Sequence, residues 1–355
     1  MTVQKKPYII VPHLIEQPTW GGSYICEMKD WLMKEGVKGK KIGQSYELYS
    51  GTKLAVGLSS TESQEYGPQY GKTINISLFS EDRPFPLIKF TQAKGNSFQL
   101  HVRPTENDQY WQPKAESWYY FEDGKITFGL KKGVDIDEYK NCCFEINNKM
   151  KELSSLVVEK SMTRAQADQL AREFITEKNP WQFVNTHIVK KGDVVDLSGG
   201  GLHHSWEEDL SACPQGNILY EIQQDVMDPV STIRSFDQGK FKEDGTIRDI
   251  QIDDYFKHID QDEKRNTLSI EKKEDGQLFD TPFYSLTSLK LEADKNMKST
   301  SSFHHLFVKD GSIEVVDESG ESIQIGRGHS CFIPQGIRYV IHPKIQGELL
   351  LTYLR

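Results

Sequence analysis

A strict alternation of polar and apolar residues between Ser97 and Val102 limits most strongly how this chain can fold. The run reads Ser-Phe-Gln-Leu-His-Val, and successive side chains of a β-strand point to opposite faces. Gln99 and His101 therefore share one face, and the apolar residues share the other. One face belongs in a core, while the other can bring a carbonyl oxygen and an imidazole nitrogen to a single metal ion.

Short strand-like runs of this kind fill most of the chain. They recur at residues 117–121, 125–130, 193–197, 218–222, 312–316 and 349–353. Turn signals at 122–125 and 309–312 predict hairpins. Many short strands separated by glycine-containing turns favour a sandwich or a jelly roll, so we predict a mainly β chain.

Residues 135–179 have the periodicity of helices instead. Thr163 and Gln166 have the spacing of a capping box. Apolar residues then follow at helical spacing, and Asn179-Pro180 ends the run. A helical block therefore interrupts the β segments, and we expect it to cover or flank the mouth of a β-barrel. The charge-rich segment 257–276 is predicted to be a solvated connection.

Composition excludes several classes of protein. The chain has 355 residues, enough for two domains, and a net charge of −9. An acidic chain lacks the clustered cations that nucleic acids and anionic membranes require, although a small anionic substrate needs only a few. No apolar run approaches the ~20 residues of a membrane span, and we find no signal peptide. Five irregularly spaced cysteines predict reduced thiols and a cytoplasmic location.

Two further residues extend the predicted metal site. Glu116 begins the strand-like run after His101, and His203 follows a stretch of three glycines. Two imidazoles, one carboxylate and the amide of Gln99 suit zinc and leave a position for water or substrate. His204 is the alternative to His203 as the ligand.

The spacing around His203 matches the second cupin motif. Gly192 is followed by five residues and then by Ser198-x-Gly200-x-x-His203. In that motif a tight turn directs the histidine into a jelly-roll barrel. The first cupin motif is represented by Gln99-x-His101 together with Glu116.

A second copy of this pattern lies near the C-terminus. It reads Gly328-x5-Pro334-x-Gly336-x-x-Tyr339, with tyrosine where the motif has histidine. Because tyrosine does not readily replace imidazole as a zinc ligand, we expect a second cupin that binds no metal. The adjacent His304 and His305 are the one feature here that would favour a second metal.

The ordered set of motifs resembles the type I mannose-6-phosphate isomerases of the cupin superfamily. The similarity runs from the N-terminus to about residue 260 and more loosely beyond. The matching segments include Trp20-Gly21-Gly22, Gly43-Gln44-Ser45-Tyr46-Glu47-Leu48, Pro86-Leu87-Ile88-Lys89, Lys114-Ala115-Glu116-Ser117-Trp118 and Glu221-Ile222-Gln223-Gln224. The chain departs from the family pattern in the segment 225–230, which is longer than in many relatives.

The resemblance implies an enzyme that interconverts mannose 6-phosphate and fructose 6-phosphate through an enediol(ate), with one zinc ion per chain. Zinc stabilises a developing oxyanion, and a nearby base takes the C2 proton. The chemistry leaves Glu221 and a zinc-bound water open as the base. The implied roles are zinc binding for Gln99, His101, Glu116 and His203, catalysis for Arg234, and substrate binding for Ser97, Lys114 and Lys240.

Two other functions stay open at this point. A non-catalytic, sugar-phosphate-binding cupin paralogue would keep the fold and lose turnover. A cupin dioxygenase would use a redox metal, but the amide of Gln99 stands where such enzymes use histidine.

The resemblance also predicts how the chain divides into domains. Residues 1–134 and 183–256 would form a discontinuous zinc-binding catalytic cupin. Residues 135–182 would be a helical insertion, and residues 257–355 a linker and the second, metal-free cupin. We thus expect two jelly-roll β units with a helical insertion.

Overall fold

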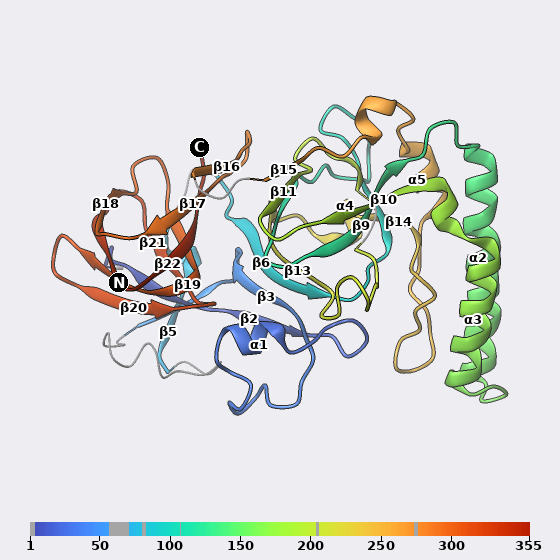
Figure 1. Cartoon of the computed structure of the whole chain (residues 1–355), viewed down its shortest axis with the longest axis horizontal. Coiled ribbons are helices and arrows are strands. Elements are labelled where there is room, and N and C mark those ends of the chain that lie inside the picture. Colours follow the sequence, from blue (N-terminus) through green and yellow to red (C-terminus); the bar gives the residue numbers. More distant parts are fainter. Residues whose placement is uncertain (1–3, 57–70, 80–82, 107, 204–205, 273–275) are drawn as a thin grey trace.

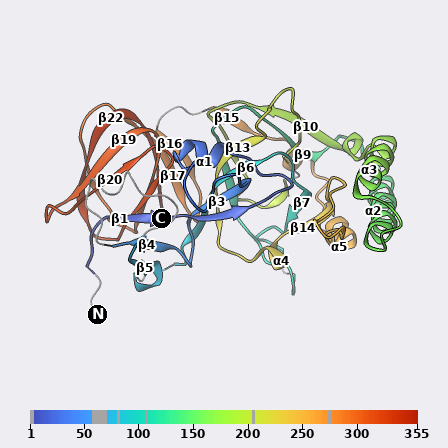
Figure 2. The same ribbon diagram turned by 90° about the horizontal axis from the view of Figure 1, so that it is seen from below.

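The computed structural model describes residues 4–56, 71–79, 83–106, 108–203, 206–272 and 276–355. Within them the chain is mainly β, as predicted, and its sheets are antiparallel. Figure 1 shows the C-terminal strands at one end, a second β unit in the middle and two long helices at the other end, and Figure 2 shows the same order. No helix of the described part has the length and apolar character needed to cross a membrane.

The middle unit contains one large sheet and two small ones. The seven-stranded sheet runs in the order β15 (Ile270–Lys272), β11 (Asp193–Asp196), β8 (Glu116–Tyr120), β13 (Asn217–Gln224), β6 (Pro86–Ala93), β3 (Ile42–Leu48) and β2 (His13–Glu16). The three-stranded sheet runs in the order β12 (Gly201–His203), β7 (Phe98–His101) and β14 (Ile233–Phe236). The remaining pair is β10 (Val184–Val189) with β9 (Gly124–Leu130).

The other unit is a ten-stranded sheet that takes strands from both ends of the chain. Its main order is β16 (Gly276–Asp280), β17 (Ser285–Leu291), β22 (Arg338–Tyr353), β19 (His304–Asp317), β21 (Ser330–Ile333), β1 (Tyr8–Val11), β4 (Lys53–Ala55) and β5 (Thr73–Asn75). In addition, β18 (Lys295–Lys298) pairs with β22, and β20 (Ser322–Gly326) pairs with β19. Three N-terminal strands that we expected in the first unit, β1, β4 and β5, thus join this sheet, where β1 pairs with the C-terminal strand β21. The domain boundaries stay a prediction.

The predicted helical block consists of α2 (Ile136–Val158) and α3 (Arg164–Lys178). The capping box at Thr163 and Gln166 is confirmed, and α3 ends at Asn179 in the left-handed conformation. Buried residues of α2 form one apolar cluster with Phe98 and Phe236. The helices therefore flank the three-stranded sheet on its apolar face.

The other helical segments are short. They are α1 (Tyr24–Met28), α4 (Asp228–Ser231), α5 (Ile252–His258), η2 (Ile76–Leu78), η3 (Pro180–Phe183) and η4 (Glu263–Asn266). The segment 257–276 is more than a solvated connection, because it also supplies β15, which pairs with β11 at the edge of the seven-stranded sheet.

Both predicted hairpins are wrong. The strands on either side of residues 122–125 do not pair with each other, since β8 pairs with β11 and β13 while β9 pairs with β10. Residues 309–312 lie inside the long strand β19, whose register against β22 shifts there and where Gly311 has a φ of 77°. A turn sequence sets a local bend, which a β-bulge within one strand also uses, and it does not choose pairing partners.

In the ten-stranded sheet, Tyr339 occupies the position of the motif's histidine. Its side chain is buried, and its hydroxyl lies 2.6 Å from Nδ1 of His304. The neighbouring His305 faces the middle unit, where its Nδ1 lies 3.0 Å from the hydroxyl of Tyr220. Both histidines thus have hydroxyl partners, and burial lowers the pKa of His304 to about 4 and that of His305 to about 3.

Candidate active site

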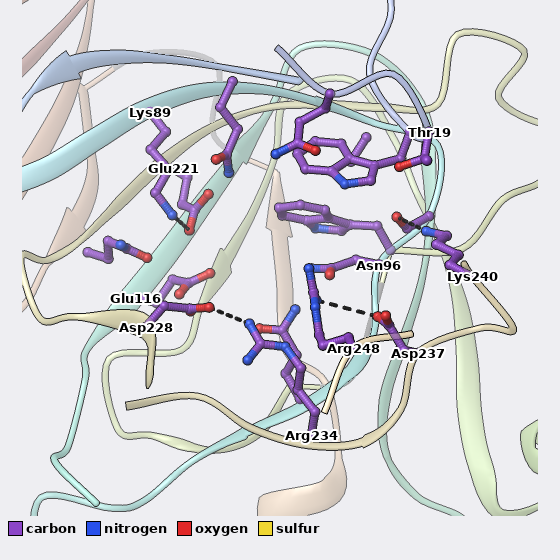
Figure 3. Close-up of a pocket in the computed structure, with 18 of the residues that line it drawn as sticks. Thr19, Lys89, Asn96, Glu116, Glu221, Asp228, Arg234, Asp237, Lys240 and Arg248 are labelled. Carbon is purple, nitrogen blue, oxygen red and sulfur yellow. Dashed lines mark hydrogen bonds and ion pairs between the residues drawn. The ribbon is translucent and has the colours of Figure 1, made fainter. Parts of the chain in front are cut away.

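A cavity of about 570 Å³ lies between the seven-stranded and the three-stranded sheets. Strands β3, β6, β8 and β13 line one side, and β7 and β14 line the other. Figure 3 shows acidic and basic side chains from both sides pointing into this space. Six predicted site residues line it directly: Gln99, Lys114, Glu116, Glu221, Arg234 and Lys240.

Strand β7 presents its two faces as the alternation predicts. Phe98 and Leu100 are buried in the cluster with the helices, whereas Gln99 lines the cavity. His101 is only 1% exposed, and its Nδ1 lies 2.5 Å from the carbonyl oxygen of Ser231. Because a carbonyl oxygen can only accept, Nδ1 carries the proton and Nε2 keeps its lone pair for a ligand.

The geometry of His101 and Glu116 fits a zinc site. Nε2 of His101 lies 3.3 Å from Oε2 of Glu116. Two ligand atoms each about 2.1 Å from a tetrahedral zinc ion are themselves about 3.4 Å apart. Burial, followed by the charge of Lys114, lowers the pKa of His101, which favours the neutral imidazole that binds metals.

The carboxylate of Glu116 is oriented by two neighbours. Trp118 Nε1 donates a hydrogen bond of 2.6 Å to Oε1, and Lys114 Nζ lies 3.1 Å from Oε2. The structure thus brings Lys114 to the predicted metal ligand, at the edge of the same cavity. Such hydrogen-bond partners hold a metal-binding carboxylate in the orientation that the metal requires.

The predicted histidine ligand is described only through its backbone. Strand β12 pairs with β7, and His203 lies opposite Gln99. The side chain of His203 and all of His204 fall outside the described residues. Within the described part, no three His, Cys, Asp or Glu side chains form a metal-binding group. Among the predicted zinc ligands, His101 and Glu116 belong to these four residue types and have side chains that the structure describes.

A glycine turn sets the approach of β12 to β7. Gly200 has a φ of +67°, and a Cβ atom on it would lie 2.9 Å from the carbonyl oxygen of Val102. Any side chain here would be strained and would push β12 away from β7.

We therefore expect Gly200→Ala to weaken zinc binding about tenfold and to lower the free energy of unfolding by about 1–3 kcal/mol. Zinc titration and urea unfolding measure the two effects. Gly199→Ala is the matched control, because a Cβ on Gly199 would meet no atom within 4 Å. Equal effects of both substitutions would contradict this account of the turn.

Arg234 is held on three sides of its guanidinium group. It lies on β14 opposite Gln99. Nε donates to Ser97 Oγ at 3.2 Å, Nη1 donates to the carbonyl oxygen of Thr232 at 3.3 Å, and Nη2 lies 2.5 Å from Oδ2 of Asp228. The predicted substrate residue Ser97 therefore contacts the predicted catalytic arginine.

Asp228 is ionised in this arrangement. Burial by itself would raise its pKa, but the charge of Arg234 and a hydrogen bond from Thr232 outweigh it and hold the pKa well below the ordinary value. Figure 3 shows the resulting ion pair at the side of the cavity near Glu116.

Glu221 lies on β13 and is 2% exposed. Lys89, opposite it on β6, donates a hydrogen bond of 3.0 Å to Oε1. Burial, with the charge of Glu116 adding to it, raises the pKa of Glu221 to about 7, although Lys89 opposes the shift. A carboxylate with a pKa near neutrality suits general base catalysis.

The far side of the cavity carries Lys240, Asp237 and Arg248. Lys240 Nζ donates a hydrogen bond of 2.6 Å to the carbonyl oxygen of Gly95, and burial lowers its pKa. Arg248 Nη1 lies 3.4 Å from Oδ1 of Asp237. Charged groups thus line both ends of the cavity.

Sequence reasoning missed several lining residues, of which Lys89 and Asp228 matter most. A lysine in the otherwise apolar run 86–90 was a usable signal, because a buried charge needs a partner. No such signal marked Asp228, which is six residues from Arg234 in a segment without periodicity. Trp20, which the sequence analysis gave no role in the site, also lines the cavity.

Comparisons with known proteins give structural matches only. No protein-family model matches the sequence, and neither does any curated protein.

Solved structures match over almost the whole chain. A mannose 6-phosphate isomerase from Bacillus subtilis matches with a TM-score of 0.64 and 16% identity, covering 99% of this chain and 100% of that one. A mannose 6-phosphate isomerase bound with zinc and yttrium matches with a TM-score of 0.64 and 11% identity, covering 98% and 99%. A phosphomannose isomerase variant from Salmonella typhimurium matches with a TM-score of 0.62 and 10% identity, over the same shares. The chain therefore has the fold of the mannose-6-phosphate isomerases, as its motifs predicted.

Proposed function

We propose that this chain is a zinc-dependent aldose–ketose isomerase that interconverts mannose 6-phosphate and fructose 6-phosphate. The observation that carries the proposal is that Nε2 of His101 lies 3.3 Å from Oε2 of Glu116, which lines one cavity together with Glu221 and Arg234. The fold supports it, because structures with this fold include mannose 6-phosphate isomerases, two of them with zinc bound.

The proposed zinc site consists of Gln99, His101, Glu116 and His203, with one ion per chain. Bound there, zinc would supply Lewis-acid stabilisation of the oxyanion that develops on the sugar. The cavity walls hold the sugar in register, and Arg234 adds a fixed positive charge beside it.

Glu221 is our candidate for the proton transfer. Its carboxylate would take the proton from C2 of the aldose and return it to C1, so that the enzyme regains its starting state. Lys89 holds one of the two carboxylate oxygens, which orients the other. The location in the cytoplasm is part of the same proposal, and the buried, free state of all five cysteines supports it.

We expect Glu221→Gln to lower kcat by about 10²–10⁴-fold, with little change in KM, because the amide cannot accept the C2 proton. Zinc content should stay at the wild-type level, since Glu221 is not in the proposed ligand set. Exchange of the C2 hydrogen with solvent deuterium should fall in parallel with kcat. Wild-type exchange in the variant would instead identify a zinc-bound water as the base.

A coupled assay of mannose 6-phosphate isomerisation on the zinc-loaded protein tests the proposal as a whole. Turnover that disappears on chelation and returns with zinc would support it. A zinc-loaded chain that binds sugar phosphates but turns over no hexose or pentose phosphate would contradict it. Such a result would leave the non-catalytic, sugar-phosphate-binding reading.

A further inference from the structure

The side chains of the cavity supply no surplus of positive charge with which to attract a phosphate. Among the described residues that line it, acidic and basic side chains are equal in number. A site for a phosphorylated sugar needs cations that are free to pair with the phosphate. Lys242 is exposed, and each of the other five basic residues already has a partner, so a phosphate bound inside the cavity competes with such a partner.

Most of these cations pair with buried acceptors. Lys89 pairs with Glu221, and Lys114 pairs with Glu116, whose side chains are 3% and 5% exposed. Arg248 pairs with Asp237, which is 20% exposed. Lys240 donates to a backbone carbonyl group, which cannot leave. Displacing these acceptors would leave buried polar groups without partners.

The ion pair of Arg234 and Asp228 differs from these. The Asp228 side chain is 60% exposed, whereas that of Arg234 is 10% exposed. Asp228 begins the short helix α4, directly after Met227, which is 73% exposed. If the carboxylate turned outward, water would solvate it at once. Ser97 and the Thr232 carbonyl group would still hold the guanidinium group in place.

We propose that Asp228 is a displaceable counter-ion that limits how strongly the site favours phosphorylated over unphosphorylated sugars. It occupies the guanidinium group of Arg234 in the free protein and gives way to the substrate's phosphate. The inference rests on the proposed function and adds a specificity-determining residue to it. The competition lowers the affinity for the phosphate group, whereas an unphosphorylated sugar does not compete with the carboxylate and binds equally well with or without it.

The test compares Asp228→Asn with Asp225→Asn in the zinc-loaded full chain. The asparagine at 228 keeps an oxygen for the hydrogen bond that Thr232 Oγ1 donates to Oδ1, now 2.7 Å long. Asp225 lines the same cavity on the same segment, but it accepts a hydrogen bond from the Ser50 backbone instead of pairing with the arginine. Both variants remove one negative charge from the cavity. Only Asp228→Asn also removes the partner of Arg234.

Calorimetric titration with inorganic phosphate provides a readout that needs no turnover. We expect Asp228→Asn to bind phosphate about tenfold more tightly than wild type, and more tightly than Asp225→Asn. Equal tightening in both variants would show a general charge effect and would overturn the inference, as would no tightening in either.

A second readout is the ratio of kcat/KM for mannose 6-phosphate to that for mannose. We expect Asp228→Asn to raise this ratio about tenfold, in line with the phosphate affinity. If no protein turns over either sugar while phosphate still binds more tightly to Asp228→Asn, the proposed function fails and the counter-ion role stands. A ratio unchanged in an active variant would overturn the specificity role.

Discussion

Replacing Glu116 by alanine is expected to abolish zinc binding and to lower isomerase activity at least about 10³-fold. The substitution removes the only carboxylate of the proposed ligand set. It also leaves His101 Nε2 without its neighbour at 3.3 Å and Lys114 without its ion pair at 3.1 Å. Metal analysis of the purified variant and the coupled isomerase assay measure the two effects.

Two further variants separate metal loss from damage to the fold. Glu116→Gln keeps the shape of the side chain and the acceptor for Trp118 Nε1, although it loses the ion pair with Lys114, so its fold should be intact while its zinc affinity is reduced. Glu16→Ala is the control, because Glu16 pairs with Lys40 and about half of each side chain is exposed. Its loss should leave zinc content and activity unchanged. Full zinc content in a folded Glu116→Ala variant would place the metal elsewhere.

Local periodicity accounts for the parts of the site that were predictable. The two-residue period of β7 separates Gln99 from Phe98, and the fold places the first on the cavity side and the second in the core. The capping box at Thr163 likewise located the start of α3. These features depend on neighbours within a few residues, which a sequence displays directly.

Long-range pairing accounts for what could not be predicted. β1 pairs with β21 more than 300 residues later, and the pairing depends on burial that no local pattern shows. The partner of Arg234 is a similar case, because nothing in the segment 225–230 shows which of its two acidic residues faces the cavity charge. Side-chain partners across a cavity are set by tertiary packing, and here that packing chose Asp228.

The largest effect on stability is expected from a buried ion pair outside the cavity. Lys29 and Glu47 are 2.7 Å apart, and their side chains are 0% and 1% exposed. Lys29 also donates to the carbonyl oxygen of Gly328, and the carboxylate accepts hydrogen bonds from Ser45 and Ser330. Since Ser330 belongs to β21 and Glu47 to β3, this network joins the two β units.

We expect Lys29→Met to lower the free energy of unfolding in urea by about 3–5 kcal/mol, because it leaves the carboxylate of Glu47 buried without a counter-charge. Lys6→Met, which breaks an exposed pair with Glu321, should change it by less than about 1 kcal/mol. A loss in Lys29→Met no larger than in Lys6→Met would show that water or a rearrangement satisfies Glu47.

The double substitution Lys29→Met with Glu47→Leu distinguishes the two roles that this pair can have. If the single variant is unstable only because a charge is left unpaired, removing both charges should recover most of the lost free energy. If the network also couples the two β units, the double variant should regain stability and yet unfold in two separate transitions, since the link to Ser330 and Gly328 is gone. A single cooperative transition in the double variant would show that the two β units are coupled by their shared apolar cluster, which includes Phe90 and Phe307, and not by the ion-pair network.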